Sequence, residues 1–434
     1  NDMTYEEARN YLEDCNQYAG EFTLEPLKEM LRRLGDPQER LQFVHIAGTN
    51  GKGSVLAYVS TVLKEAGFRT GRYISPTIFS YRERIQVNET CISREDLVRL
   101  TEKIRAAGDQ MLAEGLAHPT MFEAETALAF LYFMEQKCDL VVLECGMGGR
   151  MDATNVIQNT VAAVLASISM DHMGFLGDTL LEIAGNKAGI IKPGCTVVTM
   201  KQRPEAEQVI RERAKACGCP VVTADPEQAV NRKRELFSQT FDYGTRKEIR
   251  LSLSGEYQFA NGALALEVID VLRKKGYEIP EGAVRRGLSG TVWTGRFSVV
   301  AEAPYFIVDG AHNRDAAEKL AGTIEHYLPG KRLIYIMGVL ADKEYDAVIE
   351  KTAGYASEII TVMTPDNVRA LPAEDLARAV AVHNPHVQAA ESIGTAVERA
   401  YELAGKDDVI LAFGSLSYLG ELVRAVQKRA EEGK

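Results

Sequence analysis

The stretch of sequence that decides the fold is Phe43-Val44-His45-Ile46-Ala47-Gly48-Thr49-Asn50-Gly51-Lys52-Gly53-Ser54. Its apolar start predicts a strand, which runs into a glycine-rich turn that ends in a lysine and a hydroxyl residue. This order is typical of a loop that binds a nucleoside triphosphate. Glycines let backbone N–H groups approach phosphate oxygens, and the N-terminus of the following helix adds positive potential. Lys52 is expected to reach the terminal phosphates, and Ser54 to bind Mg²⁺.

The stretch departs from the common phosphate-loop pattern at two positions. Gly53 separates Lys52 from Ser54, and Ile46 stands where the first glycine would be. The alternative interpretation is an ordinary glycine-rich turn between a strand and a helix. Because strand, small residues, lysine and hydroxyl follow one another in order, the nucleotide site is favoured. We therefore predict an ATP site made by Gly48, Thr49, Asn50, Gly51, Lys52, Gly53 and Ser54.

Length and composition are those of a globular protein with two domains. The chain has 434 residues, of which 46% are hydrophobic and 26% are charged. One hydrophobic core rarely spans so long a chain. No apolar run approaches the roughly 20 residues that cross a bilayer, and the first residues lack the layout of a signal peptide. We therefore expect a cytoplasmic protein that binds no membrane. Since no exposed apolar helix face stands out in the sequence, we also expect a monomer.

The charge and the cysteines narrow the function further. A net charge of −11 argues against a general nucleic-acid binder, so local cations must hold an anionic substrate such as ATP. The seven cysteines are odd in number and scattered along the chain. Cys217-Gly218-Cys219 alone is a weak metal signal, and free thiols in a reducing compartment are the better interpretation.

Strands and helices alternate along the first part of the chain. Apolar runs predict strands at 43–46, 69–74, 140–143 and 161–168. Helical patterns lie within 4–34 and at 54–66, 95–113 and 122–135. Such alternation predicts an α/β sheet, in which ligands bind at the carboxyl ends of the strands.

A second series of strands and helices follows a connector at 291–296. Residues 221–255 contain only short β-like pieces, and the later strands are predicted at 306–308, 333–337, 359–363 and 409–413. We predict the fold class α/β, with two domains. Residues 1–295 would form a P-loop-type ATP-binding domain with a mostly parallel sheet, and residues 296–434 a smaller, Rossmann-like α/β domain.

Polar residues follow several predicted strands, where ligands would bind. Glu144 ends an apolar strand and is expected to bind Mg²⁺, as the acidic residue of phosphate-loop enzymes does; a surface glutamate is the alternative. A lone histidine is usually a packing or solvent residue, but Glu144 and Ser75 favour His172 as a further ligand. Lys187 lies on a predicted helix, and composition alone favours a solvated lysine there.

Two further turns of this kind lie in the C-terminal domain. Val308-Asp309-Gly310-Ala311-His312-Asn313 and Phe413-Gly414-Ser415 each join a strand end to polar groups. Either could be only a turn. Two of them in a domain attached to a triphosphate site suggest substrate binding.

Together these residues resemble the folylpolyglutamate synthases and bifunctional dihydrofolate synthase/folylpolyglutamate synthases of the Mur ligase superfamily, over nearly the whole chain. The block Gly148-Gly149-Arg150-Met151-Asp152-Ala153-Thr154-Asn155 is highly specific to this family, and the extra Gly53 is a family feature. Other matches are Ser75-Pro76, Glu83-Arg84-Ile85, Thr120 to Glu123, Asp171-His172, Lys187 to Lys192, Gln258 with Asn261, Gly295-Arg296, Asp309 to Asn313 and Gly414-Ser415. Thr77 and Tyr257 depart from the pattern, since the family often has histidine at both positions.

The resemblance implies roles for these residues. Ser54 and Glu144 would bind one Mg²⁺, and Ser75, Glu144 and His172 a second. Lys187 would be carbamylated, which requires a neutral amine and suits a buried lysine. The residues implied in catalysis are Lys52, Lys187, His172 and His312. Those implied in nucleotide binding, besides the loop, are Gln258, Asn261, Arg296, Asp309 and His312. Those implied in substrate binding are Thr120, Phe122, Asp152, Ala153 and Ser415.

The implied reaction is amide-bond formation at the expense of ATP. A carboxylate is a poor acyl donor, so attack on the γ-phosphate first makes an acyl phosphate and ADP. The amine of L-glutamate then attacks the acyl carbon and phosphate leaves. The implied partners are L-glutamate and a folate or dihydropteroate, with cations that neutralise the crowded anions. Two alternatives are a Mur-type ligase acting on a cell-wall precursor and a non-catalytic nucleotide-binding or switch protein.

Overall fold

The computed structural model describes residues 2–20, 23–75, 77, 80–170, 179–236, 238–293 and 295–433. The chain divides into two compact units. Unit 1 comprises Asn1–Ala229 and Ala260–Gly290, and unit 2 comprises Val230–Phe259 and Thr291–Lys434. Most of the segment of short β-like pieces therefore groups with the C-terminal residues. The domain boundary between residues 295 and 296 stays a prediction.

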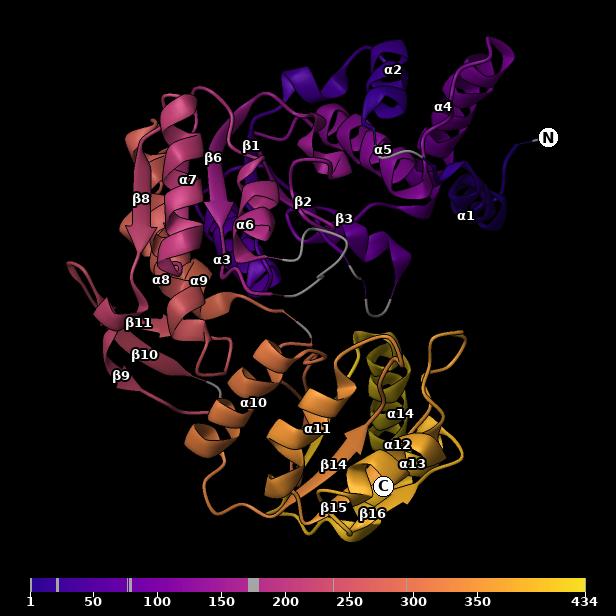
Figure 1. Ribbon diagram of the computed structural model, residues 1–434, viewed down its shortest axis with the longest axis vertical. Coiled ribbons are helices and arrows are strands. Elements are labelled where there is room, and N and C mark those ends of the chain that lie inside the picture. Colours follow the sequence, from indigo (N-terminus) through magenta and orange to yellow (C-terminus); the bar gives the residue numbers. More distant parts are fainter. Residues whose placement is uncertain are drawn as a thin grey trace. The chain divides into compact units, whose positions relative to one another are not determined.

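Unit 1 is built, within the described residues, on an eight-stranded sheet of order β4-β3-β2-β5-β1-β6-β7-β8 (Figure 1). Its strands are β1 (Phe43–Ala47), β2 (Thr70–Tyr73), β3 (Ile85–Val87), β4 (Thr90–Cys91), β5 (Leu140–Glu144), β6 (Thr160–Leu165), β7 (Thr196–Met200) and β8 (Val221–Ala224). The neighbouring strands β2, β5, β1, β6, β7 and β8 pair in parallel, and β3 and β4 form an antiparallel edge. β1 is completely buried between β5 and β6, at the kind of switch point where open α/β sheets bind ligands.

Helices cover the faces of this sheet. They are α1 (Tyr5–Asp14), α2 (Glu25–Arg33), α3 (Lys52–Glu65), α4 (Arg94–Ala113), α5 (Met121–Glu135), α6 (Leu180–Ala188), α7 (Pro204–Ala216), α8 (Gln258–Lys274) and α9 (Glu281–Gly290). Helices α1, α2, α4 and α5 share an apolar cluster with Phe43, and α6 and α7 share another with Ala47. Because side chains alternate along a strand, Phe43 and Ala47 lie on the same face of β1. Helix α3 packs against α9.

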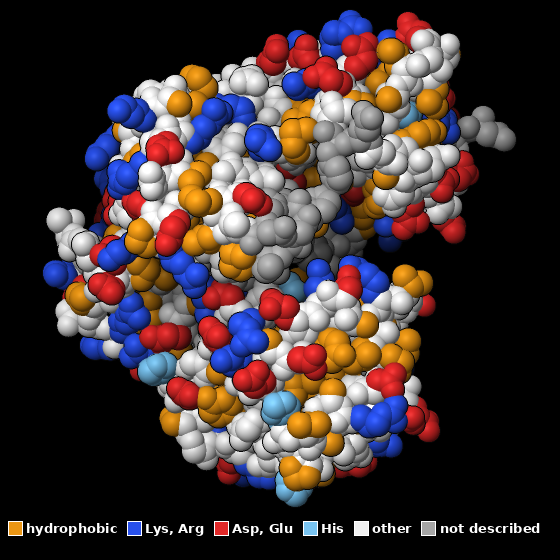
Figure 2. Space-filling view, viewed as in Figure 1, with side chains coloured by type: hydrophobic (Ala, Val, Ile, Leu, Met, Phe, Trp, Pro, Cys, Tyr) orange, Lys and Arg blue, Asp and Glu red, His pale blue; other side chains and the backbone are white. Residues whose placement is uncertain are grey.

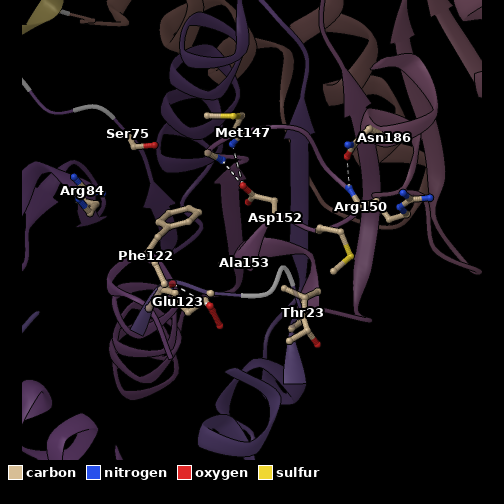
Figure 3. Close-up of a pocket in the computed structure, with 16 residues that line it drawn as sticks. Thr23, Ser75, Arg84, Phe122, Glu123, Met147, Arg150, Asp152, Ala153 and Asn186 are labelled. Carbon is tan, nitrogen blue, oxygen red and sulfur yellow. Dashed lines mark hydrogen bonds between the residues drawn. The ribbon is translucent and has the colours of Figure 1, made fainter. Parts of the chain in front are cut away.

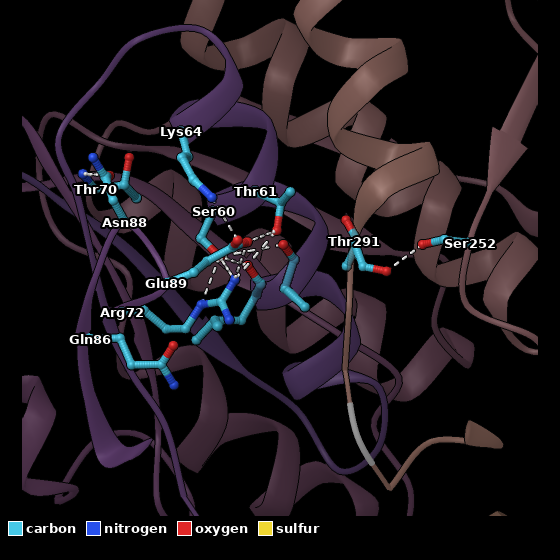
Figure 4. A network of polar contacts seen from close by, with 12 residues as sticks. Ser60, Thr61, Lys64, Thr70, Arg72, Gln86, Asn88, Glu89, Ser252 and Thr291 are labelled. Atoms are coloured by element: carbon cyan, nitrogen blue, oxygen red, sulfur yellow. Dashed lines mark hydrogen bonds and ion pairs between the residues drawn. The ribbon is translucent and has the colours of Figure 1, made fainter. Parts of the chain in front are cut away.

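A polar network around the ion pair of Arg72 and Glu89 joins α3, the helix after the predicted triphosphate loop, to strand β2 (Figure 4). The Arg72 guanidinium donates to Ser60 Oγ at 2.7 Å and pairs with the Glu89 carboxylate at 3.3 Å. Thr61 and Lys64, both on α3, also donate to Glu89. Burial lowers the pKa of Arg72 to about 10, and the charge of Glu89 opposes this shift. Because an unpaired buried charge is costly, the network fixes α3 against β2.

Unit 2 contains a second sheet, six-stranded in its described residues, of order β12-β13-β17-β14-β15-β16. The strands are β12 (Ser298–Ala301), β13 (Tyr305–Val308), β14 (Leu333–Met337), β15 (Glu358–Thr361), β16 (Val387–Ala389) and β17 (Val409–Phe413). β12 is antiparallel, and the other pairs are parallel. The helices of this part are α10 (Arg314–Tyr327), α11 (Tyr345–Thr352), α12 (Ala373–Ala381), α13 (Ile393–Leu403) and α14 (Leu419–Glu431).

A small antiparallel sheet of unit 2 comes from the segment before α8. Its strands are β9 (Val230–Lys233), β10 (Gln239–Tyr243) and β11 (Arg246–Leu251), in the order β11-β10-β9. The predicted fold class is confirmed: a mostly parallel N-terminal sheet and a second, C-terminal α/β sheet.

The surface carries charges of both signs. Figure 2 shows Lys and Arg interspersed with Asp and Glu over the described part of the face in view. Among the described residues, no helix is both long enough and apolar enough to cross a membrane. The cytoplasmic location and the monomeric state stay predictions.

Candidate active site

Four neighbouring parallel strands of unit 1 end at one edge of the sheet, and each leads into residues predicted to bind ligands. Ser75 lies just after β2, and Glu144 is the last residue of β5. The loop at 48–54 follows β1, and Ser167 and Ser169 follow β6. Since these strands are adjacent in the order β2-β5-β1-β6, the sheet brings their ends together. His172 lies outside the described residues.

The triphosphate loop is tied to its neighbours by its backbone and by Thr49. Thr49 N–H donates to the Ser167 carbonyl at 2.7 Å, and the Thr49 hydroxyl accepts from Ser169 N–H at 2.9 Å. Gly51 has a φ of +94°, and a Cβ there would lie 2.6 Å from Asn261 Oδ1. Only glycine therefore fits at this point, and Asn261, a predicted nucleotide residue, lies directly against the loop.

Helix α3 begins inside the glycine-rich stretch, at Lys52, and this places its first turn next to the loop. The first N–H groups of a helix have no partner within it, so they and the helix dipole favour a bound anion. Ser54 is completely buried in that first turn. Lys52 Nζ donates to the Cys145 carbonyl at 3.2 Å, which places its ammonium beside the end of β5.

Lys187 is buried, and the expectation of a solvated lysine from composition alone is wrong. Its side chain is 1% exposed, and its Nζ donates to the Gly48 carbonyl at 3.0 Å. Lysine is rarely buried without a partner. The last turn of α6 thus brings this amine to the first residue of the predicted ATP loop, and its carbamylation stays a prediction.

The Gly148 to Asn155 block brings the loop after β5 against the end of α6. A Cβ on Gly149 would lie 2.8 Å from the Asn186 carbonyl oxygen and 2.9 Å from Lys187 Cα. Arg150 N–H donates to the Asn186 carbonyl at 2.8 Å. Asn155 Nδ2 donates to the carbonyls of Arg150 and Gly189, at 3.0 and 3.1 Å. The block therefore fixes the position of Lys187.

Next to these strand ends, unit 1 contains a cavity of about 820 Å³ (Figure 3). Its lining residues are Ala19, Gly20, Thr23, Leu24, Ser75, Arg84, Thr120, Phe122, Glu123, Gly146, Met147, Arg150, Met151, Asp152, Ala153 and Asn186. They include every substrate residue predicted in unit 1 and the predicted metal ligand Ser75. The volume is within the range of pockets that enclose a small organic ligand.

Asp152 closes the loop that forms one wall of this cavity. Its Oδ1 accepts from the N–H groups of Gly146 and Met147, at 3.0 and 2.9 Å. Its Oδ2 accepts from Thr154 N–H at 3.2 Å and from the Thr154 hydroxyl at 2.6 Å. Burial raises the pKa of Asp152, and these hydrogen bonds oppose the rise. A carboxylate has about four acceptor positions, so these donors already use those of Asp152.

Phe122 forms another part of the lining. Its ring stacks on Tyr73, with the planes 6° apart and the centroids 6.0 Å apart. A Cβ on Gly146 would lie 2.9 Å from Phe122 Cε1, so the loop after β5 packs closely on this ring. Thr120, as predicted, is at the start of the same helix, where its hydroxyl caps α5.

Glu123 is a cavity residue that the sequence did not single out. Its Oε1 accepts from the Thr120 hydroxyl at 2.9 Å, and its Oε2 is buried with no hydrogen-bond partner among the described residues. Burial raises the pKa of Glu123, and the bonds with Thr120 oppose the rise. Thr120-x-x-Glu123 is a helix-capping pattern, which pointed to a structural role; the family match over Thr120 to Glu123 was the signal that could have found it.

The remaining predicted residues lie in unit 2, at the ends of the paired strands β13 and β17. Asp309 accepts from the N–H groups of Phe297 and Ala311 and from the Tyr257 hydroxyl. Burial raises the pKa of Asp309, and the charge of Arg296 opposes the rise.

His312 and Ser415 lie close to that aspartate. His312 Nδ1 is 3.0 Å from the Gly310 carbonyl oxygen, and Gly414, next to Ser415, donates to the Ala311 carbonyl at 3.0 Å. Gln258 is completely buried at the start of α8. Unit 2 therefore brings Arg296, Asp309, His312 and Ser415 close together; their role in binding stays a prediction.

The donor set at the strand ends of unit 1 fits Mg²⁺. Ser54, Ser75 and Glu144 offer hydroxyl and carboxylate oxygens, which are the ligands that Mg²⁺ takes in proteins. Among the described residues, no group of three or more His, Cys, Asp or Glu could bind a metal. Mg²⁺ suits this sparse set because it usually keeps several waters and binds the phosphates of its substrate.

The fold is that of a Mur-type ligase, and family comparisons agree. The Mur ligase middle domain matches residues 46–269, and the Mur ligase glutamate ligase domain matches residues 295–416.

Similar proteins define the family within this class. The chain is 35% identical to the dihydrofolate synthase/folylpolyglutamate synthase of Bacillus subtilis, over 96% of this chain and 98% of that protein. Its structure resembles Mycobacterium tuberculosis folylpolyglutamate synthase complexed with ADP, with a TM-score of 0.88 and 29% identity. The match covers 97% of this chain and 98% of that chain. It also resembles a folylpolyglutamate synthase complex with AMPPCP and folate, with a TM-score of 0.83 and 29% identity. This match covers 98% of this chain and 100% of that chain. The chain belongs to the folylpolyglutamate synthase/dihydrofolate synthase family of Mur ligases, and the resemblance seen in the sequence is confirmed.

Proposed function

We propose that this protein is an ATP-dependent ligase that joins L-glutamate to the γ-carboxylate of a folate. The cavity of unit 1 is the observation that carries this proposal. It extends from the predicted substrate residues Thr120, Phe122 and Ala153 to Ser75 and Gly146, beside the triphosphate loop. The Bacillus subtilis relative is named for both activities, so we include the addition of L-glutamate to dihydropteroate.

The strand ends of unit 1 would bind ATP and its metal. Loop N–H groups, the start of α3 and Lys52 would contact the phosphates, with Asn261 against the loop. Ser54, Ser75 and Glu144 would bind Mg²⁺, with His172 as a further ligand. The bound metal would neutralise charge on the triphosphate and on the approaching carboxylate.

Lys187 would be carbamylated. A carbamate keeps one N–H on the former amine nitrogen, so the hydrogen bond to the Gly48 carbonyl can persist after modification. The new carboxylate would add an anionic oxygen ligand close to the loop, where cations gather. Fixation of the Lys187 backbone by the Gly148 to Asn155 block would keep that ligand in place.

The cavity walls would bind the pterin end of the substrate. Phe122 offers an aromatic ring next to the loop after β5. Glu123 Oε2 is an acceptor suited to the N–H edge of a pterin, which has adjacent donors. Asp152 lines the same cavity, but its oxygens already accept four hydrogen bonds, so we infer that it mainly shapes the wall.

The reaction would proceed by activation of the carboxylate. Attack of the γ-carboxylate on the γ-phosphate forms an acyl phosphate and releases ADP. The L-glutamate amine then attacks the acyl carbon, and phosphate leaves. Lys52 would stabilise the negative charge that develops on the transferred phosphoryl group. Arg296, Asp309, His312 and Gln258 would contact the nucleotide and Ser415 the substrate, with His312 a candidate for catalysis.

Phosphate release from ATP tests the proposal. Purified protein is incubated with ATP, Mg²⁺ and L-glutamate, and separately with tetrahydrofolate, dihydropteroate or a cell-wall precursor carboxylate. Release with tetrahydrofolate is expected, and release with dihydropteroate would establish the second activity. Release with the cell-wall precursor alone would instead support the Mur-type alternative. No release with either pterin substrate contradicts the proposal.

A further inference from the structure

A short chain of buried hydrogen bonds runs from the strand of the triphosphate loop to the cavity wall. Thr154 Oγ1 lies 2.7 Å from His45 Nε2 and 2.6 Å from Asp152 Oδ2. His45 and Thr154 are completely buried, and Asp152 is 7% exposed. His45 belongs to β1, three residues before the loop. The hydrogen bonds therefore link two parts of the site that are about a hundred residues apart in sequence.

The direction of these hydrogen bonds is determined by chemistry. An ionised carboxylate can only accept, so the Thr154 hydroxyl donates its single hydrogen to Asp152 Oδ2. At its other side the hydroxyl must then accept, so His45 Nε2 bears the hydrogen and Nδ1 is unprotonated. Burial lowers the pKa of His45 to about 3, which agrees with a neutral ring. Cys145 Sγ, 3.2 Å from the same Nε2, can accept only a weak share of that hydrogen.

Packing alone does not explain a histidine at position 45. It shares a face of β1 with Phe43 and Ala47, which belong to two different apolar clusters. Its Nδ1 is buried and has no hydrogen-bond partner among the described residues. A buried acceptor without a partner destabilises the folded state, and an apolar residue would avoid that cost. Unlike an apolar residue, His45 makes a hydrogen bond to Thr154.

These hydrogen bonds end at the Asp152 carboxylate, which closes the loop after β5. Asp152 bridges to the N–H groups of Gly146 and Met147, and this loop forms one wall of the cavity. If the Thr154 hydroxyl turned away, Asp152 Oδ2 would lose its shortest hydrogen bond and the carboxylate could rotate. The wall would then lose the support that fixes its position relative to β1.

We propose that His45 is a positioning residue for the pterin substrate, which acts through Thr154 and Asp152 on the cavity wall at 146–153. The proposal rests on the proposed function of that cavity. His45 touches neither substrate nor nucleotide in this role. Its loss therefore weakens pterin binding, while ATP binding at the loop after β1 stays as it is.

Kinetics of matched variants test this assignment. H45F keeps an aromatic ring and removes the donor, T154V removes the hydroxyl, and H45Q keeps an N–H at the position of Nε2. We expect H45F and T154V to raise the KM for tetrahydrofolate about 3- to 10-fold, as for one lost hydrogen bond, with the KM for ATP within about twofold. H45Q should recover most of the loss, and H45F/T154V should be no worse than T154V alone.

Two results would overturn the proposal. One is an unchanged KM for tetrahydrofolate in H45F. The other is an equal rise of both KM values in H45F and H45Q, which indicates a merely structural role. If wild-type protein releases no phosphate with any pterin, the proposed function fails instead. The ring is then still testable by ¹⁵N NMR of the histidines in the full chain at neutral pH, where His45 should be neutral with its hydrogen on Nε2. A ring that is protonated or carries its hydrogen on Nδ1 would contradict the relay itself.

Discussion

Replacing Gly149 with alanine tests whether the loop after β5 sets the position of Lys187. The added Cβ would lie 2.8 Å from the Asn186 carbonyl oxygen and 2.9 Å from both Cα and the carbonyl oxygen of Lys187. Carbon atoms in contact prefer about 3.5–4.0 Å, so the loop and α6 must separate by about 0.6 Å or more. All three obstructing atoms belong to the backbone, and no side-chain rotation can relieve the contact.

The displacement would act on both stability and turnover. Overpacking of this kind costs about 1–3 kcal/mol. It would also lengthen the 3.0 Å bond from Lys187 Nζ to the Gly48 carbonyl. Misplacement of a site by about 1 Å can lower rates about 100-fold. For Gly149→Ala we therefore expect kcat to fall about 10- to 100-fold, measured as phosphate release at saturating ATP, L-glutamate and tetrahydrofolate.

Gly185 provides a matched control on the same helix. An added Cβ there would meet nothing closer than Val209 Cγ1, at 3.9 Å. Gly185→Ala should keep the wild-type kcat, and its free energy of unfolding in urea should stay the same or rise by about 0.5–1 kcal/mol. A Gly149→Ala protein with kcat within about twofold of wild type would refute the reasoning. So would a Gly185→Ala protein that loses as much activity as Gly149→Ala.

Three further predictions follow from the buried charged and polar groups. Lys187→Ala should abolish turnover, with the exposed Lys201→Ala as control, and a near-normal rate would remove the carbamate from the mechanism. Glu89→Gln should lower the free energy of unfolding by about 3 kcal/mol, because it removes the negative charge that pairs with the buried Arg72 guanidinium. Burial raises the pKa of Glu89, but hydrogen bonds from α3 and the charge of Arg72 outweigh it and lower the pKa below the usual 4.5. The difference in unfolding free energy between wild type and Glu89→Gln should therefore be full above pH 4.5 and shrink as the pH falls through the lowered pKa. A difference that does not depend on pH would contradict this. Glu123→Gln should raise the KM for tetrahydrofolate with the KM for ATP unchanged, and equal changes in both would exclude a specific pterin contact.

Much of the sheet could be predicted because its strands are continuous apolar runs. The run predicted at 409–413 is β17 with the same bounds, and those at 43–46 and 140–143 each extend by one residue in β1 and β5. No helix was predicted at the start of α8, which lies at Gln258. Its first turns carry the buried polar residues Gln258 and Asn261, and these interrupt the apolar periodicity on which the prediction depends.

The site was harder to predict because its key contacts join distant parts of the chain. Lys187 looks like a surface residue in sequence, and only its contact with the Gly48 carbonyl, 139 residues away, reveals its burial. Glu123 fits a helix cap, which conceals its place in the cavity. His45 lies within an apolar run, and its partner Thr154 is 109 residues away. Local patterns contain no information on such pairs.

The contacts of the Gly148 to Asn155 block suggest why this sequence is so specific to one family. Gly149 meets the backbone of α6, Asp152 closes the loop, and Asn155 bridges the loop to the end of α6. Each of these contacts is made to the protein itself. These three residues of the block therefore depend on the same loop geometry. Substitutions within it should therefore be strongly non-additive, as expected for residues that share one network.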